Sequence, residues 1–308
     1  KELGESLFKT NTPNLVIGTH ALFQETFNQE NIGLVVIDEQ HKFGVSQRDR
    51  LVRKGNYPHL LVMTATPIPR TLGLTLYGDL DCSVIHELPP GRGKVRTYIR
   101  TPDRWPKILA FIKEKLSEGR QAFIVVPRVD NEDATAGIKA VKTEARKLEV
   151  DFAPYKTGVL HGRMKPDEKE SVMAGFRANR IQILLSTTVV EVGVDIPNAS
   201  LMLIQNAEQF GLAQLHQLRG RIGRDKHDGH CILLTSENSP EVINRLTVLK
   251  ETNDGFKVAE EDLKLRGPGE LVGQEQSGLP AFQFGDLRCD LDLIELARHI
   301  ASEIQTSS

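Results

Sequence analysis

The sequence predicts an α/β protein: two parallel-sheet units in tandem, followed by a smaller helical region. Short apolar runs alternate with stretches of helical periodicity along most of the 308 residues. The runs are almost continuously apolar, which is typical of strands that helices cover on both faces. A segment dense in proline and glycine, 87–95, interrupts this alternation and indicates a linker between the two units.

Three apolar runs predict strands in the first unit, residues 1–90. They are NLVIGTH at 14–20, GLVVIDE at 33–39 and HLLVMTATP at 59–67. A strand buried on both faces delivers the residues at its carboxyl end to the ligand crevice of an open sheet. Polar residues that directly follow these runs are therefore candidate site residues.

The second unit, residues 91–236, repeats the alternation. Helices are expected at 103–117, at 132–148 (charged and largely solvated) and at 166–176, which begins with proline and two acids. The expected strands are 95–100, 121–129, 157–162, 181–187, 200–205 and 229–235.

The third region, residues 237–308, combines helices with a glycine-rich segment. Ser239 is a candidate N-cap, Pro240 occupies the first helical position, and Val242, Leu246 and Leu249 share one face. Residues 263–282 contain too much glycine for a long helix and predict an ordered loop. Residues 290–304 predict a closing amphipathic helix.

Composition and charge exclude several classes of protein. With 39% hydrophobic and 26% charged residues the chain can form a sizeable core, and its net charge of −2 means that any nucleic acid would be held by local patches. The three cysteines are far apart and form no CxxC pair, so neither a zinc site nor a disulfide framework is indicated. The sequence has no apolar run of membrane-spanning length and no signal segment. We expect a reducing, cytoplasmic setting.

The acidic pair Asp38-Glu39 stands at the end of the second apolar run. One interpretation is that these polar residues only cap a strand. The other is nucleotide hydrolysis, in which Asp38 holds Mg²⁺ and Glu39 orients and deprotonates the attacking water.

Two further motifs bear on that choice. TATPIPR, 64–70, is either a Thr/Pro turn or a coupling element whose hydroxyls bond the acidic loop. QLRGRIGR, 217–224, is either a basic surface or a set of arginine fingers, guanidinium groups that stabilise the charge on a transferring phosphoryl group. Its glycines allow the backbone to approach closely.

No phosphate-binding loop of the form G-x-x-x-x-G-K-[ST] occurs in the 308 residues. The dipeptide Gly93-Lys94 lies in the linker and is followed by Val95, so it does not complete this motif. We therefore expect the chain to be the C-terminal part of a longer protein, with an incomplete first unit that does not hydrolyse ATP alone.

Taken in order, DEQH, TAT, TTVVEVGVDIP and QLRGRIGR resemble the motor motifs of superfamily 2 helicases. The segment 259–282 resembles the translocation motif shared by the RecG family and the transcription-repair coupling factors. DEQHKFGVSQRDRL at 38–51, LHGRMKPDEKE at 160–170 and residues 266–287 most resemble the RecG family. Lys42 stands where that family usually has arginine.

This resemblance implies two RecA-like lobes, the first one incomplete, that clamp ATP and Mg²⁺ between them. It implies that Glu39 is the catalytic base and that Arg221 and Arg224 are arginine fingers. The implied nucleotide-binding residues are Asp38 (which also holds Mg²⁺), Gln40, His41, Gly193, Asp195 and Gln217. The implied coupling and DNA-contact residues are Thr19, His20, Thr64, Thr66, Arg70, His161, Arg163, Thr187, Thr188, Arg245, Arg266 and Gln276.

The implied activity is an ATP-driven, double-stranded DNA translocase that remodels stalled replication forks and Holliday junctions. Such a translocase must move past any sequence, so it should hold phosphates rather than read bases. The implied partners are branched duplex DNA and the N-terminal half of the same protein, and the expected state is a monomer in the bacterial cytoplasm. Two alternatives are a transcription-repair coupling translocase and a DNA-binding fragment without hydrolysis. A lone histidine at a strand end, such as His161, also has a purely structural interpretation.

Overall fold

A computed structural model of the chain describes residues 15–19, 22, 32–39, 58–64, 83–85, 87, 91, 93–127, 134–187, 196–266 and 291–306. The chain divides into two compact units, residues 1–65 and 66–308. The three-part division at 90 and 236 remains a prediction.

Two parallel strands form the described part of the first unit: β1 (Leu34–Ile37) and β2 (His59–Val62). Burial along β1 alternates, because Val35 and Ile37 are buried whereas Leu34 and Val36 are 59% and 51% exposed. The expectation that this strand is covered on both faces is therefore wrong. No strand forms at residues 15–19, so the described part of the expected strand 14–20 is also wrong.

The second unit contains a six-stranded, wholly parallel sheet in the order β3-β8-β7-β4-β6-β5. All six expected strands are confirmed, and with them the α/β class. Their bounds are β3 Val95–Arg100, β4 Gln121–Val125, β5 Thr157–Leu160, β6 Ile183–Ser186, β7 Ala199–Ile204 and β8 Gly229–Leu234. We call the edge where the strands begin the amino edge and the one where they end the carboxyl edge.

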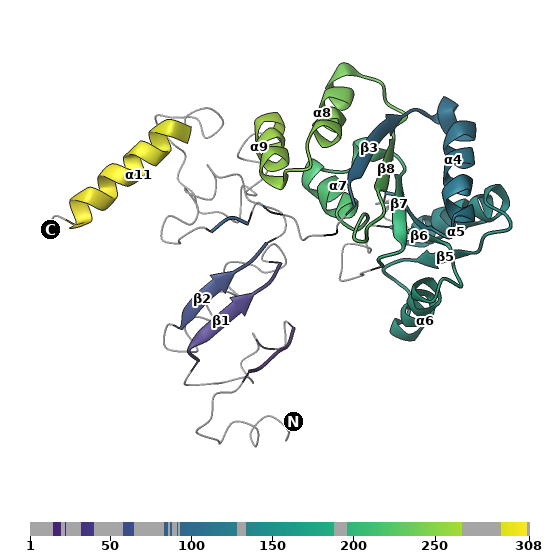
Figure 1. Cartoon of the computed structure of the whole chain (residues 1–308), viewed down its shortest axis with the longest axis horizontal. Coiled ribbons are helices and arrows are strands. Elements are labelled where there is room, and N and C mark those ends of the chain that lie inside the picture. Colours follow the sequence, from purple (N-terminus) through teal and green to yellow (C-terminus); the bar gives the residue numbers. More distant parts are fainter. Residues whose placement is uncertain are drawn as a thin grey trace. The chain divides into compact units, whose positions relative to one another are not determined.

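Alternate residues of the central strands feed two separate cores, which makes a three-layer unit (Figure 1). On β4, Phe123 and Val125 face one core while Ala122 and Ile124 face the other. The helices α4 (Trp105–Ser117) and α5 (Ala134–Asp151) cover the second of these faces.

Helix α5 contributes Val141, Ala145 and Leu148 to that core at a spacing of four and three residues. The expectation of a largely solvated helix is therefore wrong for this face. Helix α4 follows a short 3-10 turn, η3 (Pro102–Arg104), so the expected helix 103–117 is confirmed apart from its first turn.

The other face of the sheet is covered by four helices: α6 (Pro166–Arg177), α7 (Leu212–Arg219), α8 (Pro240–Glu251) and α9 (Gly255–Arg266). Helix α8 begins as predicted, with the Ser239 hydroxyl accepting the Val242 N–H at 3.4 Å. Leu246 and Leu249 of α8 and Val258 of α9 lie in the same core as the sheet. The two helices that follow residue 236 are thus continuous with the core of the second unit.

Helix α11 (Leu291–Thr306) confirms the predicted closing helix. Among the helices that the structure describes, none has the length and apolar character of a membrane-spanning helix.

Candidate functional site

The acidic pair lies where β1 ends. Asp38 is exposed and its Oδ1 accepts the backbone N–H of Glu39 at 2.9 Å, while Glu39 is half-buried. Glu39 has a φ of 54°, in the left-handed region that non-glycine residues seldom occupy. Such backbone strain concentrates at functional sites, because surrounding contacts hold the residue there. The turn presents two carboxylates from one strand end.

Three residues expected to contact DNA lie on the carboxyl edge of the six-stranded sheet. The pairing of β5 with β6 sets Leu160 beside Ser186, so His161 and Thr187 follow on neighbouring strands. Arg163 is exposed two residues beyond His161. The structure therefore brings together side chains that the sequence separates by more than twenty residues.

The His161 imidazole is in an environment that disfavours its charged form. Burial lowers its pKa below the usual value, and the charges of Lys142 and Lys169 act in the same direction. Its Nδ1 is buried and has no hydrogen-bond partner among the residues that the structure describes. The purely structural interpretation, a histidine satisfied within the core, is not supported by these contacts.

The first arginine of the QLRGRIGR motif is buried. Arg219 closes α7 with 3% of its surface exposed and donates to the carbonyl oxygen of Leu249, to that of Thr252 at 2.9 Å and to Nδ1 of His216 at 2.9 Å. It ties the end of α7 to the end of α8. Its role is structural.

His216, one turn before Arg219, is held neutral. Burial and, to a smaller extent, the Arg219 charge lower the pKa of His216 to about 4, although Asp254 acts in the opposite direction. Above pH 6.5 the ring is neutral in both the folded and the unfolded chain, so its contribution to stability is fully present. As the pH falls from 6.5 to 4, only the unfolded chain takes up the proton, and stability is lost.

We predict that acidification across this window lowers the free energy of unfolding by about 2–3 kcal/mol through His216 alone. Urea denaturation at pH 7 and pH 4.5 measures the loss. His216→Asn, which keeps an acceptor for Arg219, should show a smaller loss than the wild type. An equal loss in both proteins would contradict the assignment.

Arg221 and Arg224 lie on a loop at the opposite edge of the sheet. The loop follows α7, which is capped by Gly220, and leads into the first residue of β8, Gly229. Ile222 anchors it in the core with no exposed surface. Gly223 has a φ of 67°, and a Cβ there would lie 2.6 Å from Cγ2 of Val95, the first residue of β3. The two arginines are thus held at the amino edge, whereas His161 and Thr187 lie at the carboxyl edge.

Arg245 of α8 reaches back to the turn before α7. Its guanidinium donates to the carbonyl oxygens of Phe210 at 2.8 Å and Glu208 at 2.6 Å. Gln217 lies half-buried on α7, one turn before the loop that carries Arg221 and Arg224.

The remaining expected site residues divide into two groups. Thr19 and Thr64 are described and exposed, and Arg266 is the last residue of α9. The others lie outside the described residues, namely His20, Gln40, His41, Thr66, Arg70, Thr188, Gly193, Asp195 and Gln276.

Family models match three stretches of the chain. Residues 1–74 match the family of DEAD/DEAH box helicases and residues 103–226 the helicase conserved C-terminal domain. Residues 252–307 match the domain described as ATP-dependent DNA helicase RecG, domain 3, C-terminal. The chain is 51% identical over 288 residues to the ATP-dependent DNA helicase RecG of Synechocystis sp., and this match covers 93% of the chain.

The chain belongs to the RecG family. The RecG of Thermotoga maritima is 47% identical over 99% of the chain and that of Bacillus subtilis 45% over 96%. These matches cover 34% of the Synechocystis RecG, 39% of the Thermotoga RecG and 43% of the Bacillus RecG, so the chain spans less than half the length of these relatives.

Solved structures share the fold. The structure of RecG bound to a three-way DNA junction matches 91% of the chain, with a TM-score of 0.68 and 45% identity, over 36% of that RecG chain. Saccharomyces cerevisiae Dbp5 bound to RNA and ADP BeF3 matches 91% of the chain and 66% of its own, with a TM-score of 0.50. At 16% identity that second likeness shows the fold alone.

Proposed function

We propose that this chain is the motor part of an ATP-dependent, double-stranded DNA translocase that remodels stalled forks and Holliday junctions. The observation that carries the proposal is the match to junction-bound RecG over 91% of the chain. Strand-displacement assays with the full-length protein on a synthetic fork and on a synthetic Holliday junction test it. ATP-dependent conversion of both is expected, and inertness toward both would contradict the proposal.

In this proposal the acidic turn after β1 serves the nucleotide. Asp38 is an exposed carboxylate, the kind of oxygen ligand that Mg²⁺ accepts, and Glu39 is fixed beside it by the strained turn. When bound, Mg²⁺ would neutralise phosphate charge. Glu39 would orient the attacking water and take its proton. Gln40, His41, Gly193, Asp195 and Gln217 complete the proposed nucleotide-binding set.

Arg221 and Arg224 are the proposed arginine fingers. The support is their position on one short loop whose backbone is anchored by Ile222 and Gly223. A guanidinium stabilises phosphoryl charge best where it is positioned before the reaction, because no reorganisation is then needed. Arg219, which is buried on backbone carbonyls, is excluded from this role.

The first unit presents an apolar sheet face that suggests a further segment of the same protein as its cover. Because Val36 pairs with Leu61, the side chains of Leu34, Val36, Leu61 and Met63 share one face, and they are 59%, 51%, 49% and 41% exposed. Exposed apolar area of this kind marks a surface that is normally covered. We propose that the N-terminal half covers it and supplies the phosphate loop, so that the 308 residues alone do not hydrolyse ATP.

DNA is proposed to bind along the carboxyl edge of the second sheet through phosphate contacts. His161, Arg163 and Thr187 lie together there, and Thr188 belongs to the same proposed set. The other proposed coupling and DNA residues are Thr19, His20, Thr64, Thr66, Arg70, Arg245, Arg266 and Gln276.

We predict that Arg163→Gln in the full-length protein weakens binding to forked DNA of any sequence. The slope of log affinity against log salt should fall by about 1, since one phosphate contact is lost. Fluorescence anisotropy between 50 and 200 mM salt measures this slope. Arg177→Gln removes the same charge from the far end of α6, where Arg177 pairs with Glu170 at 2.8 Å, and should leave the slope unchanged. Equal effects of Arg163→Gln and Arg177→Gln would contradict the proposal that DNA binds along the carboxyl edge.

Two other functions remain testable. A transcription-repair coupling translocase would share the motor, but the match of residues 252–307 to the RecG-specific domain favours RecG. A non-hydrolysing DNA-binding piece would bind forked DNA in a salt-dependent manner with no turnover.

A further inference from the structure

The loop Gly220–Asp228, which we call the arginine loop, is fastened to two other segments at the amino edge. One is the chain entering β3: Gly93 N–H donates to the Asp225 carbonyl at 2.8 Å and Lys94 N–H to Asp228 Oδ1 at 3.2 Å. A Cβ at Gly93 would overlap the carbonyl oxygen of His227. Both donors of this fastening are backbone N–H groups, one acceptor is a backbone carbonyl and the other a side-chain carboxylate, and together they hold the loop between Asp225 and Asp228.

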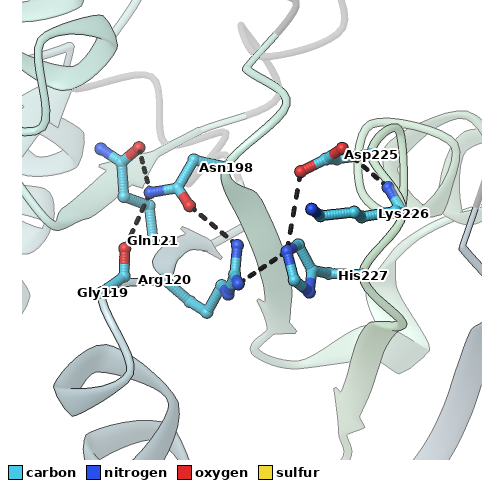
Figure 2. Close-up of polar contacts among 7 residues, drawn as sticks. All are labelled: Gly119, Arg120, Gln121, Asn198, Asp225, Lys226 and His227. Carbon is cyan, nitrogen blue, oxygen red and sulfur yellow. Dashed lines mark hydrogen bonds and ion pairs between the residues drawn. The ribbon is translucent and has the colours of Figure 1, made fainter.

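The second fastening comes from the turn between α4 and β4 and uses side chains (Figure 2). The Arg120 guanidinium points at the His227 ring, with 2.7 Å between Nη2 of Arg120 and Nε2 of His227. Nη1 of Arg120 donates to Asn198 Oδ1 at 3.2 Å. Arg120 thus bridges a residue before β7 and a residue of the arginine loop.

The far end of this bridge is anchored in the sheet. Asn198 Nδ2 donates to the Gly119 carbonyl at 2.9 Å and to Gln121 Oε1 at 3.2 Å. Gln121 is 1% exposed, and its own Nε2 donates to the carbonyls of Phe176 at 2.7 Å and Ile181 at 2.8 Å. A continuous set of hydrogen bonds therefore runs from a buried amide on β4 to the loop that carries Arg221 and Arg224.

The chemistry of the bridge fixes the state of the imidazole. A guanidinium has donors only, so Nε2 of His227 accepts and the ring proton resides on Nδ1. Asp225 Oδ2 lies 3.9 Å from the same Nε2, too far for a hydrogen bond. The contact with Arg120 therefore requires a hydrogen-bond acceptor on the side chain of residue 227.

We propose that Arg120 and His227 are positioning residues for ATP hydrolysis: their contact holds the arginine loop so that Arg221 and Arg224 meet the phosphates. This inference rests on the proposed arginine-finger function. His227 lies three residues beyond Arg224 on a short loop, so freeing its side chain relaxes the segment between Ile222, which is buried in the core, and Asp228, which accepts the Lys94 N–H. A merely structural bridge would affect stability and leave the turnover of the folded protein intact.

The test uses the full-length protein and measures kcat and KM for ATP with saturating forked DNA. Arg120→Ala and His227→Leu should each lower kcat about 10- to 100-fold, the effect expected for a misplacement of about 1 Å. KM for ATP should change less than about threefold, because the phosphate loop is untouched. His227→Gln restores an acceptor for Arg120 and should stay within about threefold of wild-type kcat. Lys226→Ala, an exposed neighbour in the same loop, should leave kcat unchanged.

A double variant separates positioning from independent effects. In an Arg224→Ala background, Arg120→Ala should cause less than its own single-variant loss, because one of the groups it positions is already gone. If Arg120→Ala fails to fold, His227→Leu carries the test, since it leaves the Arg120–Asn198 bond in place.

Each outcome has one meaning. Wild-type kcat in folded Arg120→Ala and His227→Leu, beside an inactive Arg224→Ala, would overturn this inference and leave the finger assignment standing. Strictly additive losses, or equal losses in His227→Gln and His227→Leu, would also overturn it. Wild-type turnover in both Arg224→Ala and Arg221→Ala would instead overturn the proposed fingers.

Discussion

Replacing Arg224 with alanine in the full-length protein is expected to lower kcat for ATP hydrolysis about 10³- to 10⁵-fold, the range measured for arginine fingers. The residue is exposed on a loop that the core holds at Ile222, and its Nε donates to the Gly220 carbonyl at 3.1 Å. Its removal leaves the buried core untouched. The free energy of unfolding should therefore stay within about 0.5 kcal/mol of the wild type.

Arg219→Ala is the matched control within the same motif. It should lower the free energy of unfolding by about 2–5 kcal/mol, because it leaves buried carbonyl oxygens and a cavity behind. Urea denaturation and turnover at a temperature where both variants are folded separate the two effects. A stable Arg224→Ala that still hydrolyses ATP, beside a stable Arg219→Ala that does not, would reverse the assignment.

Glu39→Gln has the second largest expected effect. It should lower turnover about 10²- to 10⁴-fold, since the amide cannot take a proton from water. The shape of the side chain is kept, as is the backbone N–H that Asp38 accepts at 2.9 Å. Affinity for a non-hydrolysable ATP analogue should therefore be unchanged.

Single-turnover hydrolysis and analogue binding measure these two quantities for Glu39→Gln. Asp38→Asn is the companion variant. It should weaken the binding of Mg²⁺ and also lower turnover. Wild-type turnover in Glu39→Gln would contradict the proposal that Glu39 is the catalytic base.

The central strands β4, β6 and β7 of the second unit could be predicted from sequence because each is a short apolar run that is buried along its whole length. The same rule failed for β1, where Leu34 and Val36 are exposed although the run is equally apolar. Apolar composition shows that a strand needs cover, but it does not show which segment provides that cover.

The three arginines of QLRGRIGR could not be separated by the motif itself. Helical spacing could have separated them, since Leu212, Leu215 and Arg219 follow one another at three and four residues and lie on the buried face of α7. Helix α5 gives the same lesson, because its many charges obscured the spacing of Val141, Ala145 and Leu148.

The contact between Arg120 and His227 had no sequence signal. The two residues are 107 positions apart, and neither belongs to a motif. Only the order of strands in the sheet brings the α4–β4 turn next to the arginine loop. The polar residue Gln121 at the start of an apolar strand was the single hint of a buried network.

The measurement that tests the central claim most directly is ATP hydrolysis by the full-length protein with and without a synthetic three-way DNA junction, beside Arg224→Ala. A junction-stimulated rate that is lost in a stably folded Arg224→Ala is the predicted result. It would mean that the arginine loop completes the nucleotide site of an ATP-driven motor that DNA stimulates. Junction-stimulated hydrolysis that persists undiminished in Arg224→Ala would contradict that account.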